Sequence, residues 1–275
     1  MVDSLRLFDY ITLLYGISLL FYFVDFVQSN KRVNRIAFWT LAGVWLLETV
    51  FFVLRMRALD YIPVFTRFEA TMFFSWLLIS FALIINYFYK MHFFTFFANL
   101  IGFTFVAFDT FARKGATQIG SVAHGNEDLL VIHISMAFIS YAAFSLACIV
   151  SIMYLVQHRL LKTKQWSPFF QRMPALDRLE SITFKLILVG FPALLIAMIL
   201  GAIWYRAYYG YFLLVDPKPI VSMVLFVLYG LYLYLRVSAG WSGQKLAWLG
   251  VIGFMIVIVN YVIVGSFMSG FHKWG

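Results

Sequence analysis

Two histidines lie at the ends of apolar stretches, where an imidazole can act as a metal ligand. His133 stands near the start of a long apolar stretch, and His272 lies in the tail that follows the last one. A third segment, 205–218, is rich in tyrosine, follows Trp204 and contains Arg206. Neutral imidazoles bind metals, arginine pairs with carboxylates, and aromatic rings form flat apolar walls. Together these residue types suit a flat metal macrocycle with carboxylate groups, provided that the fold brings them to one place.

The composition shows where such a fold must be built. Of the 275 residues, 63% are hydrophobic and only 12% are charged, which excludes an ordinary soluble domain and a disordered chain. The single cysteine, Cys148, excludes a disulfide framework, a CxxC redox pair and a cysteine-built zinc site. The formal charge of +9 fits cytoplasmic loops in contact with anionic lipid better than it fits nucleic acid. We therefore expect a multi-pass integral protein of the cell membrane that binds no nucleic acid.

Charged residues and Gly or Pro breaks delimit the apolar stretches. Each comes close to or exceeds the roughly 17–25 residues that cross a bilayer as a helix. The sequence thus predicts one all-α transmembrane domain over 1–275, a bundle of eight transmembrane helices. The eight stretches cover 7–27, 36–54, 68–89, 91–108, 129–156, 183–204, 219–236 and 246–267.

The distribution of Lys and Arg sets the expected orientation. Basic residues gather at 31–35 and in the segment 157–182, and such clusters mark cytoplasmic loops. Both termini are then extracytoplasmic, and the aromatic loop 205–218 faces outward with His133 and His272. Two imidazoles on opposite sides of a macrocycle are a common way to hold heme iron. The alternative stays open, because Tyr and Trp concentrate at membrane interfaces in general and a histidine there need have no function.

Three groups of residues carry a family resemblance. Gly201-Ala202-Ile203-Trp204, then Tyr209-Gly210-Tyr211, then Asp216-Pro217-Lys218 resemble the tryptophan-rich loop of the cytochrome c assembly family, the CcsA, ResC and CcmC heme-handling proteins. The phrase 133–142 resembles the family's first histidine motif, and Asn260 followed by Gly270, Phe271 and His272 is a looser match to the second. The resemblance covers about 68–275, with its groups in the family's order.

The resemblance implies a cofactor and a set of ligands. Heme b would be bound non-covalently, with His133 and His272 as the axial ligands of its iron. Trp204, Tyr209, Tyr211, Arg206 and Asp216 would complete the cofactor site. By size and span number the chain resembles most closely a shorter subgroup, the HemX proteins of Gram-positive bacteria. That subgroup implies a regulator, not an enzyme, that lowers the amount of glutamyl-tRNA reductase and so controls tetrapyrrole synthesis.

The chain also departs from the family pattern. Tyr209, Leu213 and Val215 replace tryptophans at the core of the loop, and the large extracytoplasmic segment of other members is missing. These departures weaken the alternative function, a heme exporter or a cytochrome c synthase subunit in cytochrome c maturation.

The segment 157–182 and Glu48 are further candidates for a functional role. The segment 157–182 is expected to be a basic cytoplasmic loop, either a solvated anchor or the place where glutamyl-tRNA reductase docks. Glu48 stands in the middle of an apolar stretch, where a charge costs about 3 kcal/mol on insertion scales. It is either a polar contact on a ligand path or between subunits, or a protonated carboxyl bonded to a neighbouring helix. It is also the only residue that favours a third hypothesis, a transporter unrelated to heme. Gly16, Gly190 and Gly201 are expected to permit close helix approach.

Overall fold

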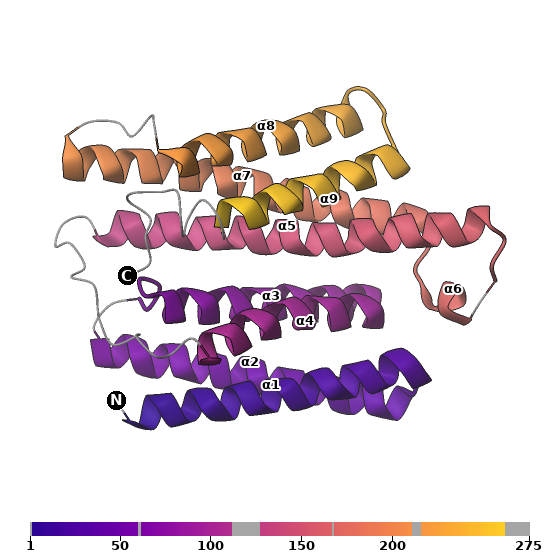
Figure 1. Cartoon of the computed structure of the whole chain (residues 1–275), viewed down its shortest axis with the longest axis horizontal. Coiled ribbons are helices and arrows are strands. Elements are labelled where there is room, and N and C mark those ends of the chain that lie inside the picture. Colours follow the sequence, from indigo (N-terminus) through magenta and orange to yellow (C-terminus); the bar gives the residue numbers. More distant parts are fainter. Residues whose placement is uncertain (1, 60–61, 112–126, 167, 211–215, 262–275) are drawn as a thin grey trace. The chain divides into compact units, whose positions relative to one another are not determined.

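The computed structural model describes residues 2–59, 62–111, 127–166, 168–210 and 216–261, which are mostly helical (Figure 1). The helices group into two compact units, Met1–Val122 and Ala123–Gly275, here called unit 1 and unit 2, within the region predicted as one domain. Unit 1 contains α1 (Val2–Gln28), α2 (Lys31–Leu59), α3 (Arg67–Tyr89) and α4 (His92–Phe111). Unit 2 contains α5 (Glu127–Lys162), α6 (Pro168–Arg172), α7 (Leu176–Tyr209), α8 (Pro217–Val237) and α9 (Gln244–Ile258).

Most of the predicted spans are confirmed as long apolar helices. Within the described residues, seven helices are long and apolar enough to cross a membrane, namely α1, α2, α3, α5, α7, α8 and α9. The apolar part of α4, Phe93–Ala107, is shorter. The all-helical membrane fold is therefore established, while the eighth span and the side on which the termini lie stay predictions.

Two predicted loops are shorter than expected, because the helices continue beyond the apolar stretches. α5 runs to Lys162 and α7 begins at Leu176, so the loop predicted over 157–182 reduces to 163–175, which includes α6. At the other end, α7 continues to Tyr209 and α8 begins at Pro217, so only 210–216 of the predicted loop 205–218 separates the two helices. Apolar residues mark the part of a helix that lies in hydrocarbon, whereas the helix itself extends into the interface with charged and aromatic residues.

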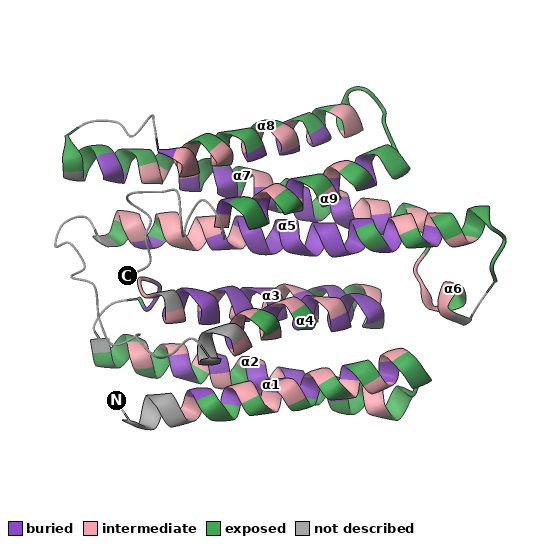
Figure 2. Cartoon of the chain, viewed as in Figure 1, coloured by how far each residue is buried: buried purple, intermediate pink, exposed green. Residues whose placement is uncertain are grey.

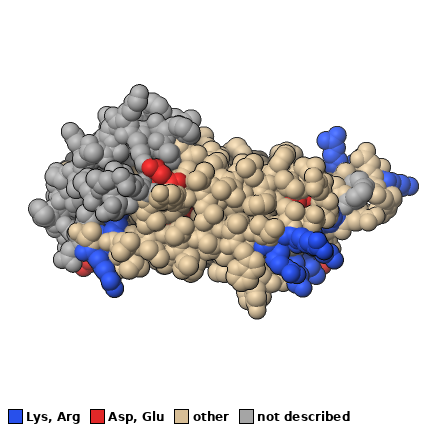
Figure 3. All heavy atoms as spheres, turned by 90° about the horizontal axis from the view of Figure 1, so that it is seen from below, with Lys and Arg blue, Asp and Glu red and all other residues tan. Residues whose placement is uncertain are grey.

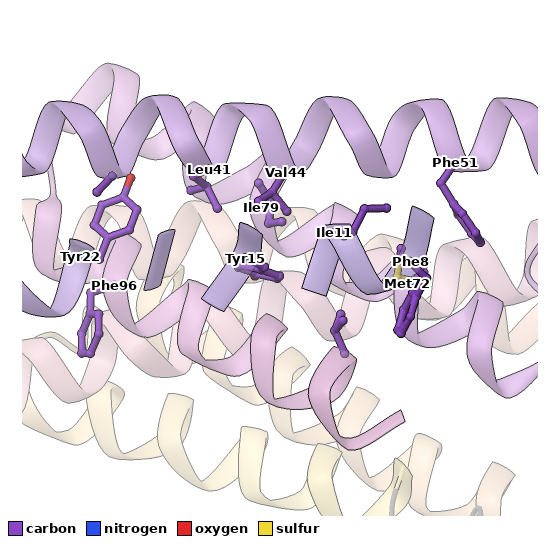
Figure 4. Close-up of a cluster of buried hydrophobic side chains, with 12 residues drawn as sticks. Phe8, Ile11, Tyr15, Tyr22, Leu41, Val44, Phe51, Met72, Ile79 and Phe96 are labelled. Atoms are coloured by element: carbon purple, nitrogen blue, oxygen red, sulfur yellow. The ribbon is translucent and has the colours of Figure 1, made fainter. Parts of the chain in front are cut away.

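Unit 1 is a bundle in which α1 packs against α2 and α4, and α3 packs against α4 and α2. The core is a cluster of large apolar side chains from all four helices (Figure 4). Large apolar side chains also stay exposed on the outside, as expected where lipid replaces water as the solvent. Among the most exposed are Leu13, Leu20, Trp39 and Leu46.

The connection between α2 and α3 is fixed by a buried carboxylate. Thr66 caps α3: its Oγ1 accepts a hydrogen bond from the Glu69 backbone N–H, and Glu69 Oε2 accepts one from the Thr66 N–H. This reciprocal pair is a capping box. The other carboxylate oxygen of Glu69 lies 2.7 Å from Arg55 Nε near the end of α2. One carboxylate therefore caps α3 and holds it to α2.

Unit 2 is organised around α5, which packs against α7 and α9, while α8 packs against both of these helices. Most of the middle of α5 is buried, whereas α8 exposes much of its surface (Figure 2). The Phe144 ring on α5 stacks on the Tyr229 ring of α8 with centroids 3.7 Å apart. A side chain at Gly190 of α7 would come within 2.7 Å of the Phe144 ring. The expected close approach at Gly190 is thus confirmed.

The charges are distributed as a membrane protein requires. On the face drawn in Figure 3, Lys and Arg side chains lie toward the two ends, and a broad band between them shows none. A charged side chain is costly in hydrocarbon and favourable at the headgroups. This band therefore fits the lipid-contacting part of the helices.

The buried pair between Arg55 and Glu69 predicts an asymmetric mutational response. Arg55→Ala leaves the buried Glu69 carboxylate without its cation, so we expect a loss of about 3 kcal/mol in the free energy of unfolding. Arg57→Ala, at an exposed position on the same helix, is the matched control and should change stability by less than about 0.5 kcal/mol. Thermal unfolding in detergent measures both, and equal effects of the two changes would refute the assigned role of the pair.

Candidate functional site

His133 lies on the second turn of α5 and is held by α7. Its Nδ1 atom is 2.6 Å from the backbone carbonyl oxygen of Ala197. A carbonyl oxygen only accepts, so Nδ1 must carry the proton and donate it in this bond. In a neutral imidazole the other nitrogen, Nε2, then has a free lone pair. This arrangement is the usual one for a metal-binding histidine, whose second nitrogen is fixed by an outer hydrogen bond.

Gly201 makes the approach of His133 to α7 possible. Gly201 lies one helical turn beyond Ala197, on the same face of α7. A Cβ atom at this position would lie 2.6 Å from His133 Cε1 and 2.8 Å from Nδ1. Any side chain here would displace the ring, which confirms the close helix approach expected at Gly201.

The last turns of α7, beyond the residues that contact His133, carry aromatic side chains. Trp204 follows Gly201 at helical spacing, and both Trp204 and Tyr205 are buried. The Tyr205 ring stacks on Tyr209 one turn later, with centroids 4.5 Å apart. Tyr209 is 41% exposed, and Arg206 is also exposed. Trp204, Arg206 and Tyr209 are thus positions on a helix and not on a loop.

Asp216 fixes the start of α8. It is the N-cap residue, and its side-chain Oδ1 accepts a hydrogen bond of 2.9 Å from the Lys218 backbone N–H. Pro217 occupies the first helical turn, where a missing N–H costs nothing. The Asp-Pro-Lys triplet therefore determines where α8 leaves the segment 211–215. A contact of Asp216 with a cofactor stays a prediction.

The buried side-chain amide of Asn260 links the end of α9 to α5 and α8. Asn260, just beyond α9, donates from Nδ2 to Tyr141 Oη of α5 at 3.1 Å and to Ser222 Oγ of α8 at 3.0 Å. Asn260 is fully buried. This network holds the end of the chain segment from which the tail 262–275 continues. The family motifs contain Asn260 and Tyr141, but the sequence alone assigns no structural role to either.

The described residues bring His133 to Ala197 and Gly201, while Trp204 lies three residues farther along α7 and Asp216 caps the start of α8. His272 and Tyr211 lie outside the described residues, so their predicted roles as axial ligand and wall stay predictions. A porphyrin supplies the equatorial nitrogens itself and needs only axial ligands from the protein. The oriented imidazole of His133, with its free Nε2, fits such a ligand, and the exposed Tyr209 and Arg206 fit a ring with carboxylate groups.

Comparisons with known proteins agree with the family resemblance found in the sequence. A family model described as "Cytochrome C assembly protein" matches residues 65–272. The chain is 38% identical to "Protein HemX" of Brevibacillus brevis over 274 residues, covering 100% of each chain. It is 36% identical to "Protein HemX" of Bacillus subtilis (strain 168), covering 99% of each. It is 24% identical to "Cytochrome c biogenesis protein CcsA" of Guillardia theta, covering 97% of this chain and 94% of that one. This chain, a multi-pass membrane protein, therefore belongs to the cytochrome c assembly family.

Proposed function

We propose that the protein binds heme b non-covalently and regulates tetrapyrrole synthesis as a HemX-type protein, without being an enzyme. The observation that carries the heme part is the 2.6 Å bond from His133 Nδ1 to the Ala197 carbonyl. It fixes the tautomer in which Nε2 can bind iron, and it does so with a backbone atom that mutation cannot remove. Membership of a heme-handling family and the similarity to two HemX proteins over nearly the whole chain support the same conclusion.

Each residue has a definite task in this proposal. Ala197 orients the imidazole of His133, Gly201 leaves room for the ring, and His272 is the second axial ligand. Trp204, Tyr209 and Tyr211 form walls against the ring, and Arg206 pairs with a propionate. Asp216, which caps the start of α8, would complete the site. Bound heme would supply an iron centre with two axial positions, and the occupancy of this site would report the heme level to the protein.

The regulatory part of the proposal needs a contact with a soluble partner. The end of α5 and the connection that follows it expose basic side chains, among them Arg159, Lys162 and Lys164. Trp166 is 63% exposed, and its ring lies edge-on to Phe170 with centroids 5.0 Å apart. Exposed Trp and Arg side chains are typical of protein contacts. We propose this segment, on the cytoplasmic side, as the docking place for glutamyl-tRNA reductase.

A second candidate function is heme export or a role as a cytochrome c synthase subunit. It is favoured by the family model and by the similarity to CcsA proteins over most of the chain. The two functions differ in what deletion does. Loss of a HemX-type regulator raises the level of glutamyl-tRNA reductase and leaves covalent c-type cytochromes normal, whereas loss of a synthase subunit removes these cytochromes.

The first prediction concerns the axial ligand. Purified protein loaded with heme should show a Soret band that His133→Ala shifts or abolishes, because the iron loses a nitrogen ligand. Added imidazole should restore the band in this variant, which separates ligation from a folding defect. His158→Ala is the matched control, because His158 lies on the same helix near its other end and stacks on Tyr154. An unchanged band in both variants would rule out His133 as a ligand.

The second prediction concerns the room beside the imidazole. Gly201→Ala adds a methyl group that overlaps the His133 ring, an overpacking that costs about 1–3 kcal/mol. We expect heme affinity to fall by about tenfold or more. Gly230→Ala on α8 is the control, because a Cβ there would lie at least 3.4 Å from Phe191. Heme titration followed by absorbance measures both affinities, and equal affinities would contradict the role of Gly201.

The third prediction concerns regulation. Trp166→Ala should raise the amount of glutamyl-tRNA reductase in cells to the level of a deletion strain, while the heme spectrum of the purified variant stays normal. Trp39→Ala is the matched control, because Trp39 is 67% exposed on α2 and is not part of the proposed docking segment. Immunoblots of the reductase provide the readout. Normal reductase levels in the Trp166→Ala strain would refute this docking place.

A further inference from the structure

Unit 1 buries a carboxyl group that the proposed heme site does not use. Glu48 lies in the middle of α2 and is fully buried. Its Oε1 accepts a hydrogen bond of 2.9 Å from Ser75 Oγ of α3, and its Oε2 has no hydrogen-bond partner. Within the described part of the chain, no Lys, Arg or His side chain forms a salt bridge with it. An ionisable residue at this depth without a counter-charge is a functional candidate by default.

The hydroxyl of Tyr15 on α1 lies beside this carboxyl. The Tyr15 hydroxyl and Ser75 Oγ, the hydrogen-bond donor to Glu48, both lie beside Gly102 of α4. Gly102 of α4 leaves the necessary room, because a Cβ there would clash with the Tyr15 hydroxyl and would lie 3.6 Å from Ser75 Oγ. Oxygen atoms from α1, α2 and α3 therefore meet where α4 has no side chain. The Arg55–Glu69 pair lies about two turns farther along α2.

The buried polar side chains described on α1 lie on one side of Glu48. On α1, the residues Tyr15, Ser18, Tyr22 and Asp25 follow each other at spacings of three and four, which places them on one helix face. All four are buried. We call them the polar stripe. We call the end of unit 1 that contains the turns 29–30 and 90–91 the turn end. The polar stripe runs from the level of Glu48 to this turn end, where Asp25 accepts a hydrogen bond of 2.8 Å from Asn34.

Other helices add polar groups to the same half of the bundle. Asn99 of α4 is buried with neither amide atom bonded, and Asn86 of α3 is buried with its Oδ1 unbonded. The hydroxyls of Tyr15 and Tyr22 are likewise buried without partners. Buried polar atoms are almost always bonded to protein or to ordered water. These unbonded atoms are therefore places where a buried water molecule would find hydrogen-bond partners.

The other half of the bundle is closed by apolar side chains. On the face of α1 that carries the polar stripe, Ile11 and Phe8 continue toward the start of the helix, and Phe51 and Met72 pack into the same cluster (Figure 4). The Phe68 ring closes this region, with its centroid 4.7 Å from Phe8 and 5.7 Å from Phe51. A polar route that ends at a mid-membrane carboxyl and is sealed beyond it has the form of a half-channel.

We propose that the turn-end half of unit 1 conducts protons between the aqueous phase at the turn end and Glu48, which binds an exchangeable proton. A hydroxyl accepts a proton on a lone pair and passes its own proton to the next group. Tyr22 and Tyr15 can therefore relay protons through intervening water without keeping a charge. At Glu48 the proton forms an O–H bond on the carboxylate, and it leaves by the same route.

Infrared spectroscopy of the full-length protein in lipid films tests this proposal. The wild type should show the carbonyl band of a protonated carboxylic acid, and Glu48→Gln should remove it. Glu180→Gln should leave this acid band in place, because Glu180 is paired with Arg236 in unit 2. Failure of Glu48→Gln to remove an acid band would overturn the proposal. Disappearance of the band on addition of sodium would overturn it too, because the site would then bind a metal cation.

The route is tested by the rate at which this band shifts when the film is flushed with D2O. Tyr22→Phe removes one relay oxygen at constant shape and should slow the exchange by about tenfold, the effect of one missing buried hydrogen bond. Met72→Leu, a volume-conserving change on the sealed side, should leave the rate unchanged. Tyr15→Phe provides a second relay variant with the same expectation. Equal exchange rates in the relay variants and in Met72→Leu would overturn the route, while the heme spectrum tests the other proposal separately.

Discussion

The hydrogen bond between His133 Nδ1 and the Ala197 carbonyl is the interaction on which the candidate site depends. It joins α5 to α7 at the end of unit 2, and it selects one tautomer of a titratable ring. The bond exists because Gly201 lets the ring lie against the α7 backbone. The aromatic end of α7 lies farther along the same helix, and the Asp216 cap begins the next one. The Ala197 carbonyl and Gly201 thus fix the tautomer and the position of the His133 ring.

Both units place polar side chains among apolar helices. In unit 2, polar side chains bind one another across helices, as in the network of Asn260 with Tyr141 and Ser222. In unit 1, Glu48 and two tyrosine hydroxyls are buried with bonding capacity to spare. Satisfied networks specify and rigidify a packing arrangement. Both units contain further buried polar atoms without a partner, but among the described residues whose atoms are left unbonded, Glu48 of unit 1 is a carboxyl group in the middle of an apolar helix without a counter-charge.

Much of the fold could be predicted from the sequence, because hydrocarbon demands long apolar helices. The predicted stretches correspond to α1–α5 and α7–α9, and their errors lie at the ends, where helices extend into the interface. His133 could be identified by its residue type and place. Its tautomer could not, because the acceptor is a carbonyl 64 positions later in the chain. The division into two units also lies beyond sequence patterns, since apolar faces directed to lipid and to protein look alike.

Glu48 also shows that the sequence identifies a residue but not its neighbours in the fold. A charge in an apolar stretch is visible in the sequence, but its neighbours come from three other helices, and only the fold reveals the one-sided polar stripe. Gly201 and Gly190 were recognisable as points of close approach, whereas the rings that occupy the space, His133 and Phe144, were not.

Pulsed electron paramagnetic resonance of the ferric, heme-loaded protein tests the central claim most directly. The protein would be prepared twice, with histidine labelled with nitrogen-15 at Nε2 or at Nδ1. The structure predicts strong coupling of the iron to the Nε2 label, with a weaker signal in His133→Ala, because Nδ1 of His133 is engaged with the Ala197 carbonyl. Strong coupling to the Nδ1 label, or no strong nitrogen coupling from either label, would contradict the account.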